Sequence, residues 1–239
     1  MAEALFFRPQ YELATNYLHD WFGLGVIEAR RLGYEVVDLS GPEATLENLL
    51  DVLRSNEFSV LFMGGHGNPN TFTGQNSSIV LRACQNDEIM SGSLSYFLSC
   101  FVGQELLPSM ISKSALSCVG FQTDFRFMVD TSYPILEDPL AEPFMATVFD
   151  HHSRILRGET IKQVWEGGIR TFDQWIAKLY PRPETIWSQV IGCLEHDRDG
   201  MIALGQQEAY AKRPAAVTWT PISTMVAPIV FGTLLALIA

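Results

Sequence analysis

The sequence predicts an α/β protein, a three-layer sandwich in which helices cover both faces of a mainly parallel central sheet. Short apolar runs that stop near glycine or proline alternate with amphipathic segments through the first 180 residues. Such alternation is typical of parallel sheets with right-handed crossovers. The composition agrees, because 47% of the 239 residues are hydrophobic and 18% are charged, which suffices for one sizeable core.

Five apolar runs have the length and composition of buried strands. They lie at residues 4–7, 34–39, 59–64, 93–99 and 115–121. The first ends before Pro9 and the second before Gly41-Pro42, residues that interrupt a strand. These runs are therefore expected to form the sheet.

Helical periodicity predicts most of the segments between the strands. Residues 16–32 carry apolar side chains at intervals of three and four and stop at Gly33, which suits a helix C-terminus. Residues 45–55 place leucines on one face. Further helices are expected at 104–112, 139–156 and 160–179, the last two joined at Gly158.

Two segments show no clear periodicity. Residues 67–78 are rich in Gly, Asn, Thr and Ser and are expected to form a loop. Residues 181–211 are mixed, with a short helix and hairpin-like pieces expected. The predicted organisation is an α/β domain at 1–180, an extension or linker at 181–213 and a hydrophobic segment at 214–239.

The C-terminal segment has the features of a membrane anchor. No charged side chain follows Arg213, and residues 222–239 are almost entirely apolar. As a helix this run would be roughly 27 Å long, close to the hydrocarbon thickness of a bilayer. Trp219 lies where an interfacial aromatic residue would sit. We expect membrane attachment with the α/β domain in the cytoplasm; a packed terminal segment or a partner-binding helix is the alternative.

Charge and cysteine spacing exclude several classes of function. The formal net charge of −11 argues against nucleic-acid binding through phosphate contacts. The four cysteines are widely spaced without a C-x-x-C pair, which argues against a zinc knuckle and a disulfide framework. The adjacent His151 and His152 would point about 100° apart on a helix, a poor metal site, so surface or capping positions are expected. No metal or cofactor is predicted.

Two of the apolar runs end in residues that suit acyl-transfer chemistry. Residues 59–67 close on Gly65-His66-Gly67, and residues 93–100 close on Cys100. In open α/β sheets, catalytic side chains gather beyond the carboxyl ends of the strands. If these two strands are neighbours, His66 and Cys100 face each other across that crevice, and a thiol beside an imidazole is an activated nucleophile.

Further motifs follow these two in a characteristic order. Cys100 begins Cys100-Phe101-Val102-Gly103, Gly120-Phe121 closes the next strand, and Pro139 opens the helix that leads to Gly158. Over about residues 5–179, this ordered set resembles the caspase-haemoglobinase fold, particularly the gingipain-like peptidases and the related CHAT domains.

The resemblance implies a caspase-like domain that acts as a cysteine endopeptidase on polypeptide substrates, without a cofactor. Cys100 would be the nucleophile, forming a thioester, and His66 would polarise the scissile amide and protonate the leaving amine. Backbone N–H groups of Gly67 and Cys100 would stabilise the oxyanion, and no third catalytic residue is evident. Independently of the resemblance, Gly67 allows close backbone approach, and a helix starting after Cys100 would favour the thiolate.

The resemblance also suggests a specificity pocket. In these peptidases an acidic residue often selects Arg or Lys, and Asp124, just past the 115–121 strand, is the candidate, with Asp130 behind it and Gln122 beside it. The alternative is that Asp124 is a turn or cap residue.

Other functions remain open. A caspase-like domain can be a catalytically silent scaffold or signalling module, because fold does not fix function. A flavodoxin-like ligand-binding module would use the same crevice, but Arg8-Pro9-Gln10 replaces a Gly-rich phosphate loop. A glutamine amidotransferase would need a Gly-x-Cys-x-Gly elbow, which Cys100 lacks. Glu12, Glu28 and other scattered acids are interpreted as a solvated face, and His19 and His196 as histidines without catalytic neighbours.

Overall fold

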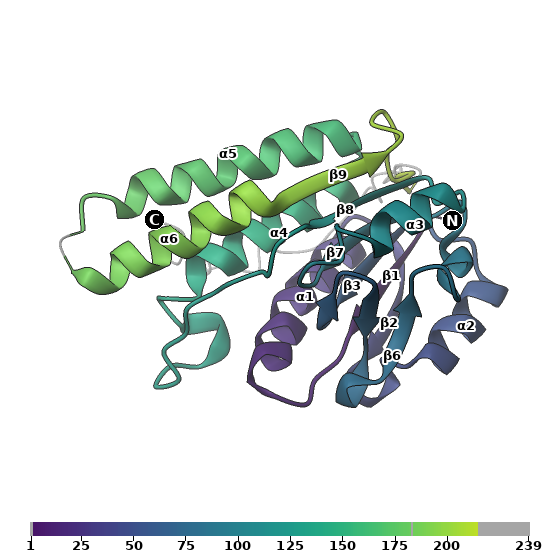
Figure 1. Cartoon of the computed structure of the whole chain (residues 1–239), viewed down its shortest axis with the longest axis horizontal. Coiled ribbons are helices and arrows are strands. Elements are labelled where there is room, and N and C mark those ends of the chain that lie inside the picture. The colour runs from purple at the N-terminus through teal and green to yellow at the C-terminus, as the bar shows by residue number, and fades with distance from the viewer. Residues whose placement is uncertain (1, 183, 215–239) are drawn as a thin grey trace, which may run out of the picture.

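The computed structural model describes residues 2–182 and 184–214, and Figure 1 shows helices packed around a central sheet. The strands of this sheet are β1 (Glu3–Arg8), β2 (Glu35–Ser40), β3 (Val60–Gly64), β7 (Leu94–Leu98), β8 (Ser117–Phe121) and β9 (Met201–Gly205). Their order is β2-β1-β3-β7-β8-β9. Every neighbouring pair is parallel except β8 with β9. The predicted mainly parallel sheet is confirmed.

Helices cover both faces of the sheet. They are α1 (Leu13–Arg31), α2 (Leu46–Ser55), α3 (Leu106–Ser112), α4 (Glu142–Leu156), α5 (Ile161–Leu179) and α6 (Thr185–Gly200). Helices α1, α4, α5 and α6 contribute to one hydrophobic cluster, while α2 and α3 contribute to the other. Figure 1 shows α4, α5 and α6 grouped on one side of the molecule and α2 on the opposite side.

Successive side chains of a strand point to opposite faces of the sheet, so a single strand contributes to both hydrophobic clusters. In β1, Phe6 enters the first cluster, whereas Leu5 and Phe7 enter the second, as expected from the period of two in a strand. All three side chains are fully buried, and burying a side chain of this size contributes about 1.5–3 kcal/mol. A strand buried on both faces reads as a continuous apolar run, and this is why the strands were recognisable in the sequence.

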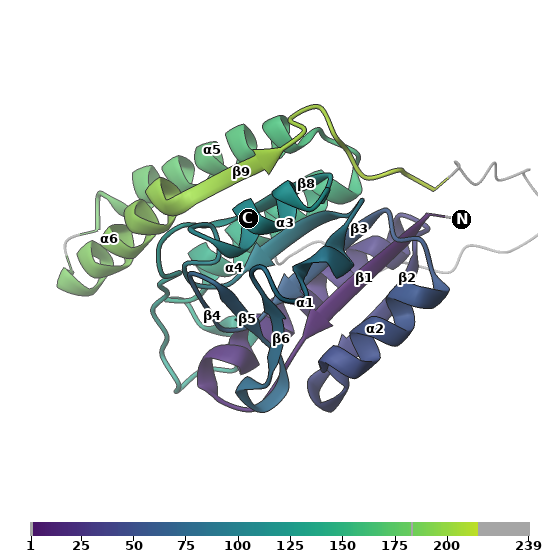
Figure 2. The ribbon, with the colours of Figure 1, turned by 45° about the vertical axis from the view of Figure 1, so that its right-hand side comes forward.

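Residues 67–78 were expected to form a loop, and this prediction was wrong. Together with residues up to Arg82 they form β4 (Gly67–Asn68), β5 (Thr71–Thr73) and β6 (Ile79–Arg82), an antiparallel three-stranded sheet. Figure 2 shows these strands beside the carboxyl end of β1. Fully buried Phe72 and Val80 anchor this sheet in the second cluster, so tertiary packing overrides the polar composition.

Residues 181–211 are more regular than expected. Residues 185–200 form the long helix α6, and β9 pairs with β8 from Ser117↔Gly205 to Phe121↔Met201. This segment therefore supplies the edge strand of the main sheet. The hydrophobic segment predicted at 214–239 lies outside the described residues from position 215 onward. In the described part of the chain, none of the helices combines the length and apolarity needed to span a bilayer.

Candidate active site

The predicted catalytic pair lies at one edge of the sheet. Strands β3 and β7 are adjacent and parallel, with Gly64 paired to Leu98, so both strands end at the same edge. His66 and Cys100 each lie two residues beyond these ends. Both line one cavity of about 70 Å³. The condition that the two strands be neighbours is therefore met.

His66 is held from its backbone and from its ring. Its carbonyl accepts hydrogen bonds from the backbone N–H of Thr73 at 2.9 Å and from the Thr73 hydroxyl at 3.2 Å. Its Nε2 lies 3.0 Å from Glu12 Oε1, and the Tyr11 ring lies edge-on with its centroid 6.2 Å away. The side chain is 45% exposed, so a substrate can reach the ring.

Glu12 is the site residue that the sequence interpretation missed. Its carboxylate caps α1, accepting hydrogen bonds from the backbone N–H groups of Thr15 at 2.7 Å and Ala14 at 2.9 Å. Partial burial acts to raise the pKa of Glu12, but these N–H groups and the His66 ring outweigh it and hold the pKa below its ordinary value. Glu12 is thus ionised and accepts only, so Nε2 of His66 must donate, and Nδ1 remains the proton acceptor of the neutral ring.

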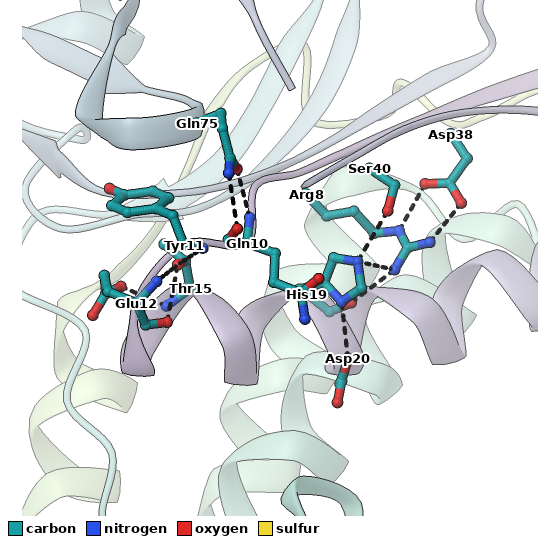
Figure 3. Close-up of polar contacts among 10 residues, drawn as sticks. All are labelled: Arg8, Gln10, Tyr11, Glu12, Thr15, His19, Asp20, Asp38, Ser40 and Gln75. Atoms are coloured by element: carbon teal, nitrogen blue, oxygen red, sulfur yellow. Dashed lines mark hydrogen bonds and ion pairs between the residues drawn. The ribbon is translucent and has the colours of Figure 1, made fainter. Parts of the chain in front are cut away.

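The loop that carries Glu12 is fixed on both sides (Figure 3). Gln10 and Gln75 exchange two hydrogen bonds of 2.8 Å, and the Thr15 hydroxyl accepts from the backbone N–H groups of Tyr11 and Glu12 at 3.1 Å. These contacts tie the start of α1 to the segment that follows β5, the strand on which Thr73 holds His66. The carboxylate and the imidazole are therefore positioned by the same framework.

Cys100 is partly exposed and has an acidic environment. Burial raises the pKa of its thiol, and the charges of Asp124 and Asp197 raise it further, while a hydrogen bond from the Phe125 backbone acts in the opposite direction. The expectation that a following helix would favour the thiolate was wrong. Helix α3 begins at Leu106, six residues beyond Cys100 in the sequence, and the acidic residue Glu105 is at its N-cap position. The resting form at neutral pH is the thiol.

Gly67 brings the loops after β3 and β7 together. A Cβ atom at this position would collide with the Ser99 hydroxyl and would lie 2.8 Å from Val102 and 2.9 Å from the Cys100 carbonyl. The glycine therefore permits close contact between the loop after β3 and the loop after β7. Its role in holding an oxyanion stays a prediction.

The predicted specificity residues lie after β8, outside the walls of the Cys100 cavity. Gln122 is exposed; its N–H donates to the Gly200 carbonyl at 2.8 Å, and its carbonyl accepts from Gln104 at 2.7 Å. Asp124 is paired with Arg126 at 2.8 Å and with His196 at 2.9 Å. The hydrogen bond from Arg126 is the main cause that lowers the pKa of Asp124. Asp130 accepts from Ser132.

A buried acid from α6 supports this loop. Asp197 is fully buried, and its Oδ1 accepts from the backbone N–H of Arg126 at 2.8 Å. Its Oδ2 has no hydrogen-bond partner among the described residues, and the same holds for the hydroxyls of Ser99 and Thr123. Burial raises the pKa of Asp197 well above its ordinary value. Neither Asp197 nor His196 was recognised from the sequence, which left this helix unplaced.

His19 has polar neighbours that the sequence did not indicate (Figure 3). Its Nδ1 lies 2.9 Å from Asp20, and its Nε2 lies 2.9 Å from the Ser40 hydroxyl, a superficially catalytic arrangement. However, Nε2 also lies 2.9 Å from Nη1 of Arg8, which is held by Asp38. Because the guanidinium of Arg8 can only donate, its N–H occupies the Nε2 lone pair that His19 would need to act as a base. This cluster is structural.

His151 and His152 are not surface residues, and that interpretation was wrong. Both are fully buried, and Tyr96 Oη lies 3.0 Å from Nδ1 of His151. Aromatic rings surround His152, at centroid distances of 4.5 Å to Phe22 and 4.7 Å to Phe62. Burial lowers the pKa of His151 to about 4 and holds the pKa of His152 well below its ordinary value, so both rings are neutral. Within residues 2–182 and 184–214, no three His, Cys, Asp or Glu side chains converge as a metal site requires.

A six-stranded, mainly parallel sheet with helices on both faces and a Cys/His pair at its carboxyl edge defines the class: the chain has a caspase-like α/β fold. The structure is similar to gingipain R (RgpB) from Porphyromonas gingivalis. In the complex of the RgpB pro- and mature domains, the TM-score is 0.58 at 11% identity, covering 88% of this chain and 48% of the other. The Arg-specific cysteine proteinase gingipain R gives a TM-score of 0.55, with the same identity and coverage.

The similarity concerns the fold. The chain spans about half the length of these gingipain chains, at 48% of each. Compared by sequence, it matches no family model and no curated protein. The predicted resemblance to gingipain-like proteins is thus confirmed at the level of structure.

Proposed function

We propose that the protein is a cysteine peptidase that hydrolyses peptide bonds through Cys100 and His66. One observation carries this proposal: both side chains lie two residues past adjacent parallel strands and line one cavity, with an ionised carboxylate against Nε2 of the imidazole. A nucleophile, a base and an acid that orients the base are the groups that acyl transfer through a thioester uses, and their presence around one cavity supports the proposal.

The proposed reaction proceeds through a thioester. When a peptide carbonyl lies against Cys100, Nδ1 of His66 takes the thiol proton and the sulfur attacks the carbonyl carbon. His66 then gives that proton to the leaving amine as the C–N bond breaks. Water, deprotonated by His66, hydrolyses the thioester and restores the thiol. Glu12 stabilises the transient imidazolium, and backbone N–H groups of Gly67 and Cys100 are proposed to hold the oxyanion.

The raised pKa of Cys100 fits a nucleophile that is deprotonated only when substrate binds. A resting thiol resists oxidation and metal binding, because both require thiolate. The proton transfer to His66 then becomes part of the reaction.

The raised pKa of Cys100 is also compatible with a second candidate, a catalytically silent caspase-fold scaffold. A partly buried thiol with a raised pKa is also what a cysteine without a catalytic role would have. The scaffold reading predicts that Cys100→Ala retains every biological activity of the protein.

Labelling with peptidyl acyloxymethyl ketones separates these candidates. We expect labelling at Cys100 that is abolished by Cys100→Ala and by His66→Ala. Cys84→Ala is the matched control, because Cys84 is an exposed free thiol that does not line the Cys100 cavity. Failure of all probes to label Cys100, with iodoacetamide still alkylating it, would support the scaffold.

A further inference from the structure

The cavity beside the catalytic pair is small, and its walls are almost wholly apolar. Besides His66 and Cys100, it is lined by Ala14, Leu18, Gly65, Leu98, Ser99, Phe125 and Phe127. No Asp, Glu, Lys or Arg side chain is among them. A charged substrate side chain would lose its hydration here without gaining a partner.

The volume limits what can enter. An apolar cavity of about 150 Å³ binds benzene, whereas this cavity measures about 70 Å³. It therefore has room for a few carbon atoms and excludes an aromatic ring or a long basic side chain.

Two charges outside the cavity reinforce the exclusion of basic residues. Asp124, the acid expected to select Arg or Lys, is already neutralised by Arg126 and held by His196. Arg126 itself lines an open groove of about 450 Å³ that shares Ala14, Phe125 and Phe127 with the cavity. A substrate cation that approached along this groove would meet a like charge and would have to displace an ion pair.

Resting on the proposed peptidase function, we propose that this cavity binds the side chain on the acyl side of the scissile bond and selects a small, uncharged aliphatic residue such as Ala or Val. That side chain starts one bond from the α-carbon of the attacked residue, so it must lie beside Cys100. Phe125 and Phe127 set the upper size, and Ala14 sets the depth on the α1 side.

The test is a panel of acyloxymethyl ketones with one peptide backbone and Ala, Val, Leu, Phe, Arg, Lys, Asp or Asn at the acyl-side position. We expect Cys100 to be labelled by the Ala and Val probes at least about 10-fold faster than by the Phe, Arg and Asp probes. This limit is the low end of the discrimination that a pocket achieves for a single methylene. Labelling sites are assigned by mass spectrometry.

Three variants check the origin of the preference. Ala14→Leu retains the backbone N–H that Glu12 accepts and should slow the Val probe about 10-fold relative to the Ala probe. Phe125→Ala should shift the preference towards Leu and Phe. Asp124→Asn should leave the order of preference unchanged. Thermal melting of each variant establishes that the fold is retained.

The outcomes separate the two proposals. Fastest labelling by Arg or Lys, lost in Asp124→Asn, would overturn the inference while leaving the peptidase function intact. Equal rates across the panel, or a preference for Asp or Asn, would also overturn it. Absence of labelling by every probe would instead remove the peptidase function, and this inference with it.

Discussion

Glu12 and His66, separated by 54 positions in sequence, meet through a 3.0 Å contact between Oε1 and Nε2. The same carboxylate caps α1 through two backbone N–H groups. A single side chain thus begins the first helix and fixes the tautomer of the proposed base. From the sequence alone, Glu12 can be recognised only as an acidic residue near the start of a helix.

Glu12→Gln should separate these two roles. The amide oxygen can still accept from the Thr15 N–H, but the amide nitrogen then faces the Ala14 N–H. The melting temperature should therefore fall less than in Glu12→Ala, whereas the neutral amide no longer stabilises imidazolium. We expect the rate constant for Cys100 labelling to fall at least about 10-fold, with little change in probe affinity. This loss is smaller than the roughly 10²–10⁴-fold loss expected when the base itself is removed. Glu12→Ala should lower both the rate and the stability, the latter by about 0.5–2 kcal/mol. An unchanged rate in Glu12→Gln would remove Glu12 from the site.

Gly67→Ala should damage the site by steric means. The added methyl collides with the Ser99 side chain and the Cys100 carbonyl, so the loops after β3 and β7 must separate. We expect a loss of about 1–3 kcal/mol in the free energy of unfolding, together with loss of labelling. Gly192→Ala is the matched control: it lies in α6 with open space around it and should stabilise the protein by about 0.5–1 kcal/mol. The two variants are compared by chemical denaturation.

Alkylation of Cys100 should depend on pH as a raised thiol pKa requires. In the absence of substrate, the iodoacetamide rate at Cys100 should continue to increase through pH 9, because the thiolate is the reactive form and burial disfavours it. The rate is measured by mass spectrometry at each pH. A plateau already reached by pH 7 would contradict the resting thiol and would restore the expectation of a preformed thiolate.

Asp197→Asn should make the protein more stable at neutral pH. The pKa of Asp197 is raised above its ordinary value of 3.8, so its favourable contribution is complete below pH 3.8 and is lost as pH rises through the folded-state pKa. Asparagine keeps the acceptor for the Arg126 N–H without the charge. The stability gain relative to wild type should therefore grow as pH rises above 3.8, to about 1–2 kcal/mol, within the cost of an unsatisfied buried polar group.

Denaturant titrations at several pH values test this prediction. Asp199→Asn is the control, because that side chain is 70% exposed and its replacement should have little pH-dependent effect. A constant difference between Asp197→Asn and wild type at all pH values would show that the buried carboxyl does not titrate as expected.

The sheet and the proximity of Cys100 to His66 could be predicted because both follow from local sequence patterns. Strands buried on two faces are continuous apolar runs, and their parallel alignment brings the residues after β3 and β7 to one edge. The contacts of Glu12 and Asp124 could not be predicted, since they depend on which distant elements pack beside them. His151 was misassigned because a polar side chain on a helix suggests solvent, whereas tertiary packing against Tyr96 buries it.

The antiparallel pairing of β8 with β9 has a consequence for how this protein can be divided. A chain shortened after residue 180 would retain His66, Cys100 and Glu12. However, it would expose the backbone of β8 along the edge that β9 now covers, and an exposed strand edge can pair with a strand of another molecule. It would also lose the α6 carboxylate that anchors the Arg126 backbone, and with it the wall built by Phe125 and Phe127. We therefore expect a fragment to need residues up to at least Gly205 to keep this sheet edge paired.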